Sequence, residues 1–245
     1  MSSSKTAIVV GGSLGGLFTG IVLKRLGHRV TIFERSSTPI LQDQGAGIVA
    51  GGDVLQFLQQ FDKTRREVAV VSRVRHHLNK DGKEYDRHEW EQKMTSWDLL
   101  YHVLRANFDG VESKYVTPPK DDEGDVKYEY GTAVNGIELD EETGEMVVSY
   151  KDRNKQECEA RAARVFAADG PSSAIRQILL PEDKRIYAGY VHPLVKANLM
   201  EGCLARNCSG IKTIEFSKRC LCREIHILRY SRTSKSSNSS SNARY

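Results

Sequence analysis

The sequence predicts an α/β fold built around a parallel sheet, and three consecutive segments near its start carry this prediction. Residues 6–11, TAIVVG, form a short apolar run that ends in glycine, which is typical of a buried strand. Apolar residues then recur at helical spacing until Gly27, and residues 28–35, HRVTIFER, have the composition of a second strand. Strand, helix and strand follow within roughly thirty residues, as in the βαβ unit of parallel sheets.

The sequence predicts further helices and strands as far as Pro181. A turn at residues 79–83, NKDGK, separates two segments rich in strand-forming residues and indicates a β-hairpin. Thr95 and Ser96 are typical of a helix start, and Asp98 follows them in the first turn. We expect helices at 54–61, 95–108 and 174–180, hairpin strands at 68–77 and 84–90, further strands at 127–139, 145–152 and 158–168, and a loop at 44–49.

The composition is that of an ordinary globular protein. Hydrophobic residues make up 39% of the 245 residues and charged residues 28%. No apolar run approaches the roughly 20 residues that a membrane-spanning helix needs. The first ten residues lack the features of a secretion signal, and the odd number of cysteines argues against a disulfide framework. We therefore expect a cytoplasmic protein with no membrane partner.

Residues 192–245 differ from the preceding sequence in charge and in pattern. They contain ten Lys and Arg against three Asp and Glu, and four of the five cysteines, before a serine-rich end. This composition predicts a basic, largely disordered tail.

The positive charge of this tail could attract nucleic acid, but a solvated tail is the favoured interpretation, so no nucleic-acid partner is expected. The cysteines lack the paired C-x2-C spacing of structural zinc sites, so no metal site is expected.

Residues 11–16, GGSLGG, form a glycine-rich turn between the first strand and the first helix. In the dinucleotide fingerprint G-x-G-x-x-G, Gly11 and Gly16 hold the first and last glycine positions, while Ser13 holds the second. Gly11 permits the sharp turn, Gly16 permits close packing of helix and sheet, and the amides at the helix start face a pyrophosphate. The Ser13 hydroxyl can donate a hydrogen bond to a phosphate oxygen. A purely structural glycine turn is the alternative.

Glu34 stands at the end of the second predicted strand, 23 residues after Gly11. A carboxylate at this place can accept hydrogen bonds from the ribose hydroxyls of an adenosine. It would repel a 2′-phosphate, so NADP is not expected at this site. An acidic surface residue at a strand end is the alternative interpretation.

A third segment, residues 167–176 (AADGPSSAIR), predicts a strand-to-helix turn with Ser172 or Ser173 as the cap. Together with the two preceding motifs it resembles the FAD-dependent aromatic monooxygenases of the p-hydroxybenzoate hydroxylase-like family, in particular the 2,6-dihydroxypyridine 3-monooxygenase branch. The resemblance covers about residues 5–191, and its motifs follow in the same order: VVGGSLGGL, FERS, QGAGIV, TSWDLLYHVLRANFDG, AADGPSSAIRQILLP and YAGYV.

The resemblance implies a Rossmann-like FAD-binding domain with a parallel sheet and a β-meander crossover, followed by the start of a mixed α/β substrate domain. It implies FAD as cofactor, NADH or NADPH as co-substrate, and O2 with a small aromatic molecule as substrates. No side chain is expected to be catalytic, because the cofactor carries the chemistry. The residues that it assigns to cofactor binding are Gly11, Ser13, Leu14 and Gly16 (pyrophosphate), Glu34 and Arg35 (ribose), Ala46, Gly47 and Ile48 (GAGI loop), Val134 (adenine), and Asp169, Gly170 and Arg176 (Asp-Gly turn).

Two departures from the family pattern bear on function. Ser96 replaces the arginine that many relatives place before the third helix, as expected for this branch. The Gly-Asp motif that holds the ribityl chain in the family is absent from the sequence after Arg176. The resemblance therefore predicts an aromatic monooxygenase impaired in this form, with a non-catalytic FAD- or dinucleotide-binding fragment as the alternative. A disulfide-type flavoenzyme is disfavoured, because Cys158 is the only cysteine before residue 192.

These observations divide the sequence into three parts. Residues 1–178 are expected to form the FAD- and NAD(P)-binding domain, with a β-hairpin inserted at about 68–92. Residues 179–191 are expected to start the substrate-binding domain. Residues 192–245 are expected to be non-homologous sequence that results from a truncation, a frameshift or a retained intron. The oligomeric state is not predicted.

Overall fold

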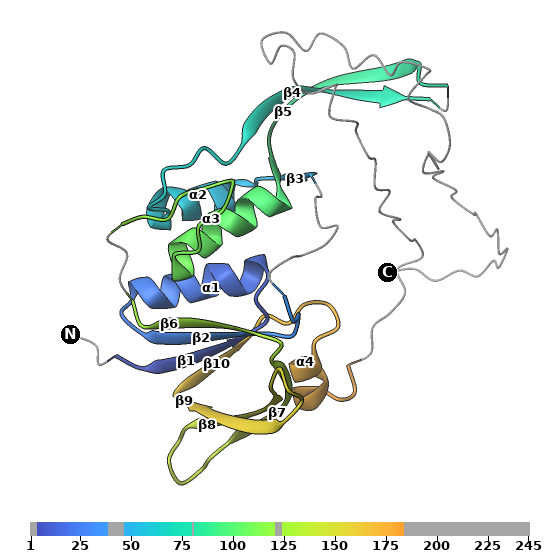
Figure 1. The fold of residues 1–245 in the computed structure, drawn as a ribbon. Helices are drawn as coiled ribbons and strands as arrows, with labels where there is room; N and C mark the ends of the chain where they lie inside the picture. The colour runs from blue at the N-terminus through green and yellow to red at the C-terminus, as the bar shows by residue number, and fades with distance from the viewer. Residues whose placement is uncertain (1–3, 39–46, 80, 121–123, 184–245) are drawn as a thin grey trace, which may run out of the picture. The chain divides into compact units, whose positions relative to one another are not determined.

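The structure is a computed structural model and describes residues 4–38, 47–79, 81–120 and 124–183 (Figure 1). Three predictions lie outside these residues: Ala46 as a cofactor residue, most of the start of a substrate domain, and the basic tail at 192–245. Contacts divide the chain into two units, Met1–Arg75 with His88–Ile186, and His76–Arg87 with Tyr187–Tyr245. The described part of the second unit is the tip of a β-hairpin.

A four-stranded parallel sheet forms the centre of the first unit, as the sequence predicts. Its strands are β1 (Thr6–Val10), β2 (Arg29–Glu34), β6 (Val126–Tyr130) and β10 (Arg164–Ala167), in the order β10-β1-β2-β6. Val10 lies opposite Phe33 on one side and Ala167 on the other. The three strands therefore end together, and the loops that follow them meet at one edge of the sheet.

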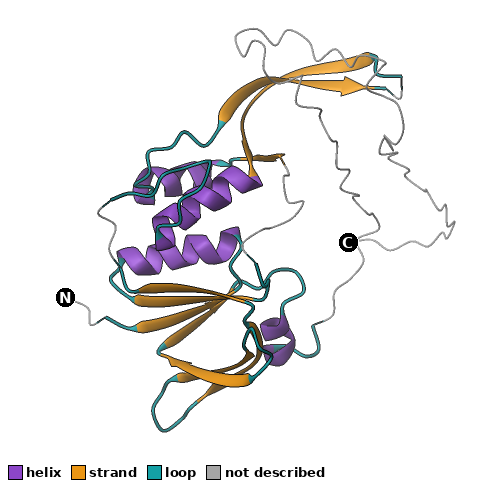
Figure 2. Cartoon of the chain, in the orientation of Figure 1, coloured by secondary structure: helices purple, strands orange, loops and turns teal. Residues whose placement is uncertain are grey.

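Helices cover one face of this sheet. They are α1 (Leu14–Arg25), α2 (Gly52–Phe61) and α3 (Trp97–Asp109), and Figures 1 and 2 show all three on the same side of the strands. A buried cluster joins the two layers, with Val9 and Ile32 from the strands against Leu17 from α1 and Leu104 from α3. No helix among the described residues has both the length and the apolar character needed to cross a bilayer.

A β-meander and a short helix cover the opposite face. The meander consists of β7 (Ala133–Leu139), β8 (Met146–Lys151) and β9 (Glu157–Ala162), and the helix is α4 (Ala174–Leu179) (Figure 2). Ile8, Val10 and Phe33 point to this side and pack with Val148 and Ile175. Because both faces of β1 are covered, its residues form a continuous apolar run rather than an alternating one.

Two predicted strands are each divided in the structure. Residues 127–139 form β6 and β7, which belong to different sheets, and Gly131 between them has a φ of 69°. Residues 158–168 form β9 and β10, again in different sheets. In both cases the chain passes from the parallel sheet to the meander or back. A propensity pattern does not show such a change of sheet, because strand-forming residues continue through it.

The predicted hairpin is present: its first strand is close to the predicted 68–77, and its second strand extends beyond the predicted 84–90. It consists of β4 (Val70–Leu78) and β5 (Glu84–Ser96), and β3 (Gly47–Val49) pairs with the far end of β5. The prediction of a loop at 44–49 is therefore wrong for residues 47–49. The prediction that a helix starts at residue 95 is early by two residues, since β5 continues to Ser96, whose hydroxyl caps α3 by accepting from the Leu99 amide at 3.2 Å.

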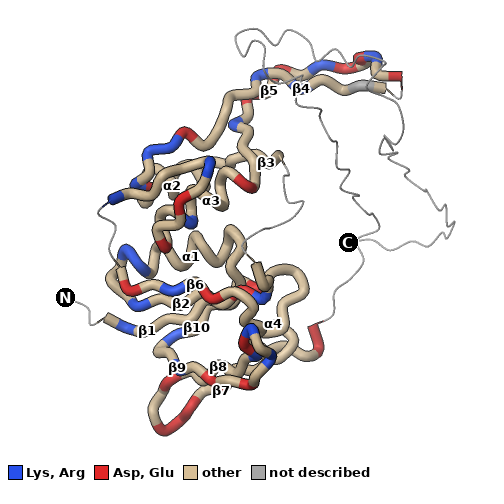
Figure 3. The backbone as a smooth tube through the Cα atoms, in the orientation of Figure 1, with Lys and Arg blue, Asp and Glu red and all other residues tan. Residues whose placement is uncertain are grey.

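The turn between β7 and β8 is strongly acidic, as the red segment at the end of the meander in Figure 3 shows. In this turn, Asp140 Oδ2 lies 2.5 Å from a guanidinium nitrogen of Arg161 in β9. The hydrogen bond from Arg161 lowers the pKa of the Asp140 carboxyl to about 2. In the unfolded chain the carboxyl has an ordinary aspartate pKa, near 3.9. Because the pKa is lower in the folded protein, the ion pair stabilises the fold fully at pH values above about 3.9, and this stabilisation is lost as the pH falls towards 2.

We expect Arg161→Gln to raise the pKa of Asp140 towards its ordinary value, because the ion pair and its hydrogen bond are removed. A carboxyl NMR titration measures this directly. The lowered pKa of Glu157, which depends on Asn135 and Lys151, serves as the internal control and should not move. An Asp140 pKa that stays low in the variant would contradict the assignment to Arg161.

Candidate functional site: a cavity at the strand ends

A cavity of about 630 Å³ lies at the edge of the sheet where β1, β2 and β10 end. Its volume is within the range of small-molecule and cofactor sites. The walls come from the loops after these three strands, from the start of β7 and from the start of α3. Its lining residues are Val10, Gly11, Ser13, Phe33, Glu34, Arg35, Ser36, Trp97, Thr132, Ala133, Val134, Ala168, Asp169, Gly170, Pro171, Ser172 and Ala174.

The turn after β1 has the geometry of a phosphate-binding turn. Gly11 has a φ of 102°, and a Cβ there would overlap the carbonyl of Ala168. A Cβ at Gly16 would overlap the carbonyl oxygen of Gly11. Gly11 is therefore required for the close approach of this turn to the end of β10, and Gly16 for the close approach of α1 to the turn. This packing leaves the start of α1 directed at the cavity, where the helix dipole and the first amides favour an anion.

Ser13 is the N-cap of α1, and its carbonyl oxygen accepts the first helical hydrogen bond from Leu17 at 3.0 Å. Its side chain makes no capping hydrogen bond, is exposed and lines the cavity. Ser13 therefore does not obstruct the turn, and its hydroxyl can donate to an anion at the helix start. A serine at this position is thus compatible with the geometry of the turn.

The Glu34 carboxylate is fixed by two backbone amides. Its Oε2 accepts from the Gly12 amide and its Oε1 from the Ser36 amide, each at 2.8 Å. A carboxylate has about four acceptor positions, so two remain for other donors. The backbone carbonyl oxygen of Glu34 accepts a hydrogen bond from the Thr132 amide, which places the start of β7 beside Glu34. Glu34 is thus held at the cavity wall with capacity for ribose hydroxyls.

The turn after β10 forms the opposite wall. Gly170 has a φ of 80°, and Asp169 Oδ2 accepts from the Ile175 amide at 3.3 Å. Ser173 caps α4 by accepting from the Arg176 amide at 2.9 Å, which resolves the choice between two predicted caps in favour of Ser173. The Ile175 amide, in the first turn of α4, therefore orients the Asp169 carboxylate.

The structure brings seven of the thirteen predicted cofactor residues to this cavity: Gly11, Ser13, Glu34, Arg35, Val134, Asp169 and Gly170. Leu14 and Gly16 lie in the first turns of α1, beneath the glycine-rich turn. Gly47 and Ile48 lie in β3, opposite Ser96 and Thr95. Arg176 is outside the cavity lining, where its guanidinium donates to the Pro171 carbonyl at 2.6 Å and lies 3.6 Å from Asp183.

Sequence reasoning missed several residues of the site. Trp97 and Thr132 line the cavity, and neither belongs to a glycine or acidic motif. Tyr128 was also missed, although its hydroxyl donates to the Gly12 carbonyl oxygen at 2.8 Å. One signal was present: Gly12 occupies a position of the fingerprint that admits any residue, and a glycine there indicates a close neighbour.

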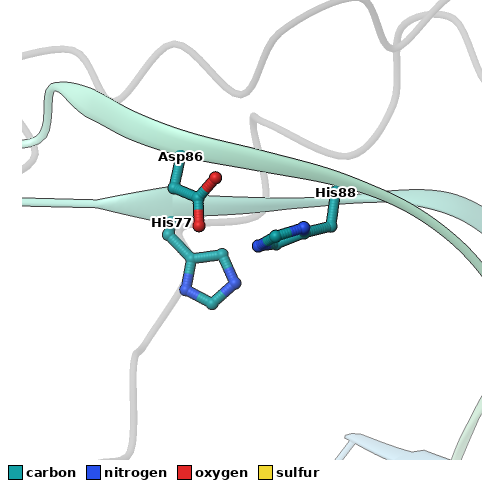
Figure 4. Close-up of side chains that lie close together, drawn as sticks. All are labelled: His77, Asp86 and His88. Atoms are coloured by element: carbon teal, nitrogen blue, oxygen red, sulfur yellow. The ribbon is translucent and has the colours of Figure 1, made fainter.

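A separate group of polar side chains lies on the β4–β5 hairpin. Figure 4 shows His77 on one strand close to Asp86 and His88 on the other, and their potential ligand atoms lie within 4.8 Å of one another. Each of the three residues takes part in at least one interaction, and we assign no further function to them.

Comparison with known proteins agrees with this geometry. Residues 4–191 match the family model described as FAD binding domain. The chain is 29% identical over 184 residues to 2,6-dihydroxypyridine 3-monooxygenase of Paenarthrobacter nicotinovorans, an alignment that covers 75% of this chain and 41% of that protein.

Among solved structures, 2,6-dihydroxypyridine-3-hydroxylase from Arthrobacter nicotinovorans matches with a TM-score of 0.55 at 23% identity, over 74% of this chain and 41% of that one. The p-nitrophenol 4-monooxygenase from Pseudomonas putida matches with a TM-score of 0.55 at 18% identity, over 72% and 43%. These likenesses confirm the predicted fold. The chain spans less than half the length of these relatives. Because the family model covers more than half of this chain, the chain belongs to the FAD binding domain family.

Proposed function

We propose that this chain binds the adenosine diphosphate half of FAD in the strand-end cavity and represents the cofactor-binding part of an NAD(P)H-dependent aromatic-ring monooxygenase. The observation that carries the proposal is the convergence of Gly11, Ser13, Glu34 and the Asp169–Gly170 turn on one cavity of about 630 Å³. A helix start and a fixed carboxylate on the same wall match a ligand that joins a pyrophosphate to a ribose.

The residues of the cavity fit FAD in distinct roles. The start of α1, with the Ser13 hydroxyl, would hold the pyrophosphate, and the remaining acceptor positions of Glu34 would hold the ribose hydroxyls. Val134 would lie beside the adenine, and Asp169 and Gly170 would form the wall towards the rest of the cofactor. When bound, FAD would supply the redox chemistry, with NADH or NADPH as the reductant and O2 as the oxidant. The protein binds and orients the cofactor.

The proposed co-reactants follow from the relatives. The 2,6-dihydroxypyridine and p-nitrophenol monooxygenases are named for small aromatic substrates, and we propose a small aromatic substrate with O2 for the complete enzyme. We also propose a cytoplasmic location and no nucleic-acid partner, as the composition predicts.

A non-catalytic FAD- or dinucleotide-binding fragment is the second candidate function. It rests on the sequence after Arg176, which contains no Gly-Asp motif of the kind that the family resemblance leads us to expect. The visible spectrum of the purified chain and its NADH or NADPH oxidation with added FAD separate the two candidates. Oxidation above that of free FAD supports the enzyme, whereas bound flavin without oxidation supports the fragment.

We propose the domain division that the sequence indicates. Residues 1–178 would be the FAD- and NAD(P)-binding domain with its hairpin at about 68–92, and residues 179–191 the start of the substrate domain. That residues 192–245 are non-homologous is supported by the family match, which extends to residue 191, and by the change of charge after it. Translation of the coding DNA in all three frames after codon 191 tests this division: a family-like substrate domain in another frame would identify a frameshift or a retained intron.

We expect Glu34→Gln to weaken FAD binding about tenfold or more, because one oxygen acceptor becomes an NH2 group that faces a backbone amide donor. Titration of FAD fluorescence with the full chain measures the change. Glu129→Gln on neighbouring β6 is the matched control: it is exposed, and its binding should equal that of the unaltered chain. Equal affinity for FAD in Glu34→Gln would contradict the ribose role.

A further inference from the structure

Gly12 is held on both sides by residues outside the glycine-rich turn. Its N–H donates to Glu34 Oε2 and its carbonyl oxygen accepts from Tyr128 Oη, both at 2.8 Å. Tyr128 lies on β6, 116 positions further along the chain. A Cβ at Gly12 would overlap the Tyr128 hydroxyl, so the glycine makes room for this contact.

Tyr128 is in turn fixed by a buried to half-buried group of side chains, which we call the Arg105 cluster. The Arg105 guanidinium carbon lies 3.8 Å from the centroid of the Tyr128 ring, a cation–π arrangement. Two hydrogen bonds of 2.9 and 2.6 Å join Arg105 to Asp109, and the exposed fractions of their side chains are 5% and 14%. The members of the cluster are Tyr101, Arg105, Asp109, Tyr128 and Tyr130.

The Tyr128 hydroxyl is a permanent hydrogen-bond donor. Burial raises its pKa well above the ordinary value, and the hydrogen bond with Tyr101 acts in the same direction. The hydroxyl therefore stays protonated at physiological pH. Because the Gly12 carbonyl oxygen can only accept, the direction of this hydrogen bond is settled.

We propose that Tyr128 is a positioning residue for the pyrophosphate of FAD and acts through the Gly12–Ser13 peptide. A trans peptide points its C=O and its N–H in opposite directions, so anchoring the Gly12 oxygen also fixes the direction of the Ser13 N–H. Ser13 is the N-cap of α1 and lines the cavity. A hydrogen bond accepted by the carbonyl also strengthens the amide of the same peptide as a donor. This inference rests on the proposed binding of FAD.

Tyr128→Phe isolates the hydroxyl, because the ring remains over Arg105 and against Gly12. Tyr130→Phe is the matched control: it removes a second hydroxyl of the same cluster, one that bonds to Arg105 and Tyr101. We expect Tyr128→Phe to weaken FAD and ADP binding by the same factor, about three- to tenfold, the range of one neutral hydrogen bond. Tyr130→Phe should stay within about twofold of the unaltered chain, although both variants lose a cluster hydrogen bond.

Amide NMR of the full chain reports on the peptide itself. Loss of a hydrogen bond to the Gly12 carbonyl should shift the Ser13 amide nitrogen in Tyr128→Phe and leave it in place in Tyr130→Phe. Unchanged FAD affinity in Tyr128→Phe, or equal weakening in both variants, would overturn the inference. If the unaltered chain binds no FAD, the proposed function fails instead, and the Ser13 shift alone then decides whether Tyr128 orients this peptide.

Discussion

Gly16→Ala is expected to destabilise the fold by about 3 kcal/mol and to reduce FAD affinity more than tenfold. The new Cβ would overlap the carbonyl oxygen of Gly11, which belongs to the backbone and cannot rotate away. Relief requires α1 to move away from the end of β1, and this movement withdraws the helix start from the cavity. Chemical denaturation measures the first effect and FAD titration the second.

Gly15→Ala is the matched control in the same helix. No atom lies within 4 Å of a Cβ at Gly15, and this residue is exposed. Alanine forms helices better than glycine, so we expect a gain of roughly 0.5–1 kcal/mol. A loss of stability in Gly15→Ala as large as that in Gly16→Ala would show that the packing of α1 against the turn is not the reason that glycine is required.

Arg105→Leu is expected to cost about 3–5 kcal/mol of stability, because it leaves the Asp109 carboxylate mostly buried without its partner. Burial opposes the charge of Arg105, but the Asp109 hydrogen bonds and charge outweigh it, and the pKa of Arg105 lies above its ordinary value. Arginine is therefore charged at every accessible pH. Urea denaturation of the full chain measures the change.

Two further variants test whether the loss of stability in Arg105→Leu comes from the unpaired Asp109 carboxylate. Arg105→Leu combined with Asp109→Leu should recover part of the loss, since replacing a buried ion pair with apolar residues is often neutral. Arg73→Leu removes an exposed ion pair, Arg73–Glu91 at 2.9 Å, and should cost less than about 1 kcal/mol. Equal costs for Arg73→Leu and Arg105→Leu would contradict the structural role of the cluster.

The first βαβ unit shows how much of the fold could be predicted. The residues of β1, α1 and β2 were placed to within one or two positions, because an apolar run, a helical period and glycine at both ends of the helix agree with one another. The seven predicted residues that line the cavity follow from the same unit and from the family motifs. Their roles in binding remain predictions.

The missed features depend on contacts between distant parts of the chain. Residues 127–139 have the composition of one strand, and only Gly131, with a positive φ, marks the passage from the parallel sheet to the meander. The hydrogen bond from Tyr128 to Gly12 spans 116 positions, and no local period carries it. Arg105 lies among apolar residues of α3, where a sequence pattern cannot distinguish a buried cation held by tyrosines from an exposed one.

Calorimetric titration of the full 245-residue chain with FAD, followed by competition with ADP, tests the central claim most directly. The account predicts saturable binding of FAD that ADP displaces, because both ligands present a pyrophosphate and a ribose to the cavity. The account would be contradicted by a chain that is folded by circular dichroism but binds neither ligand, or by FAD binding that excess ADP does not displace.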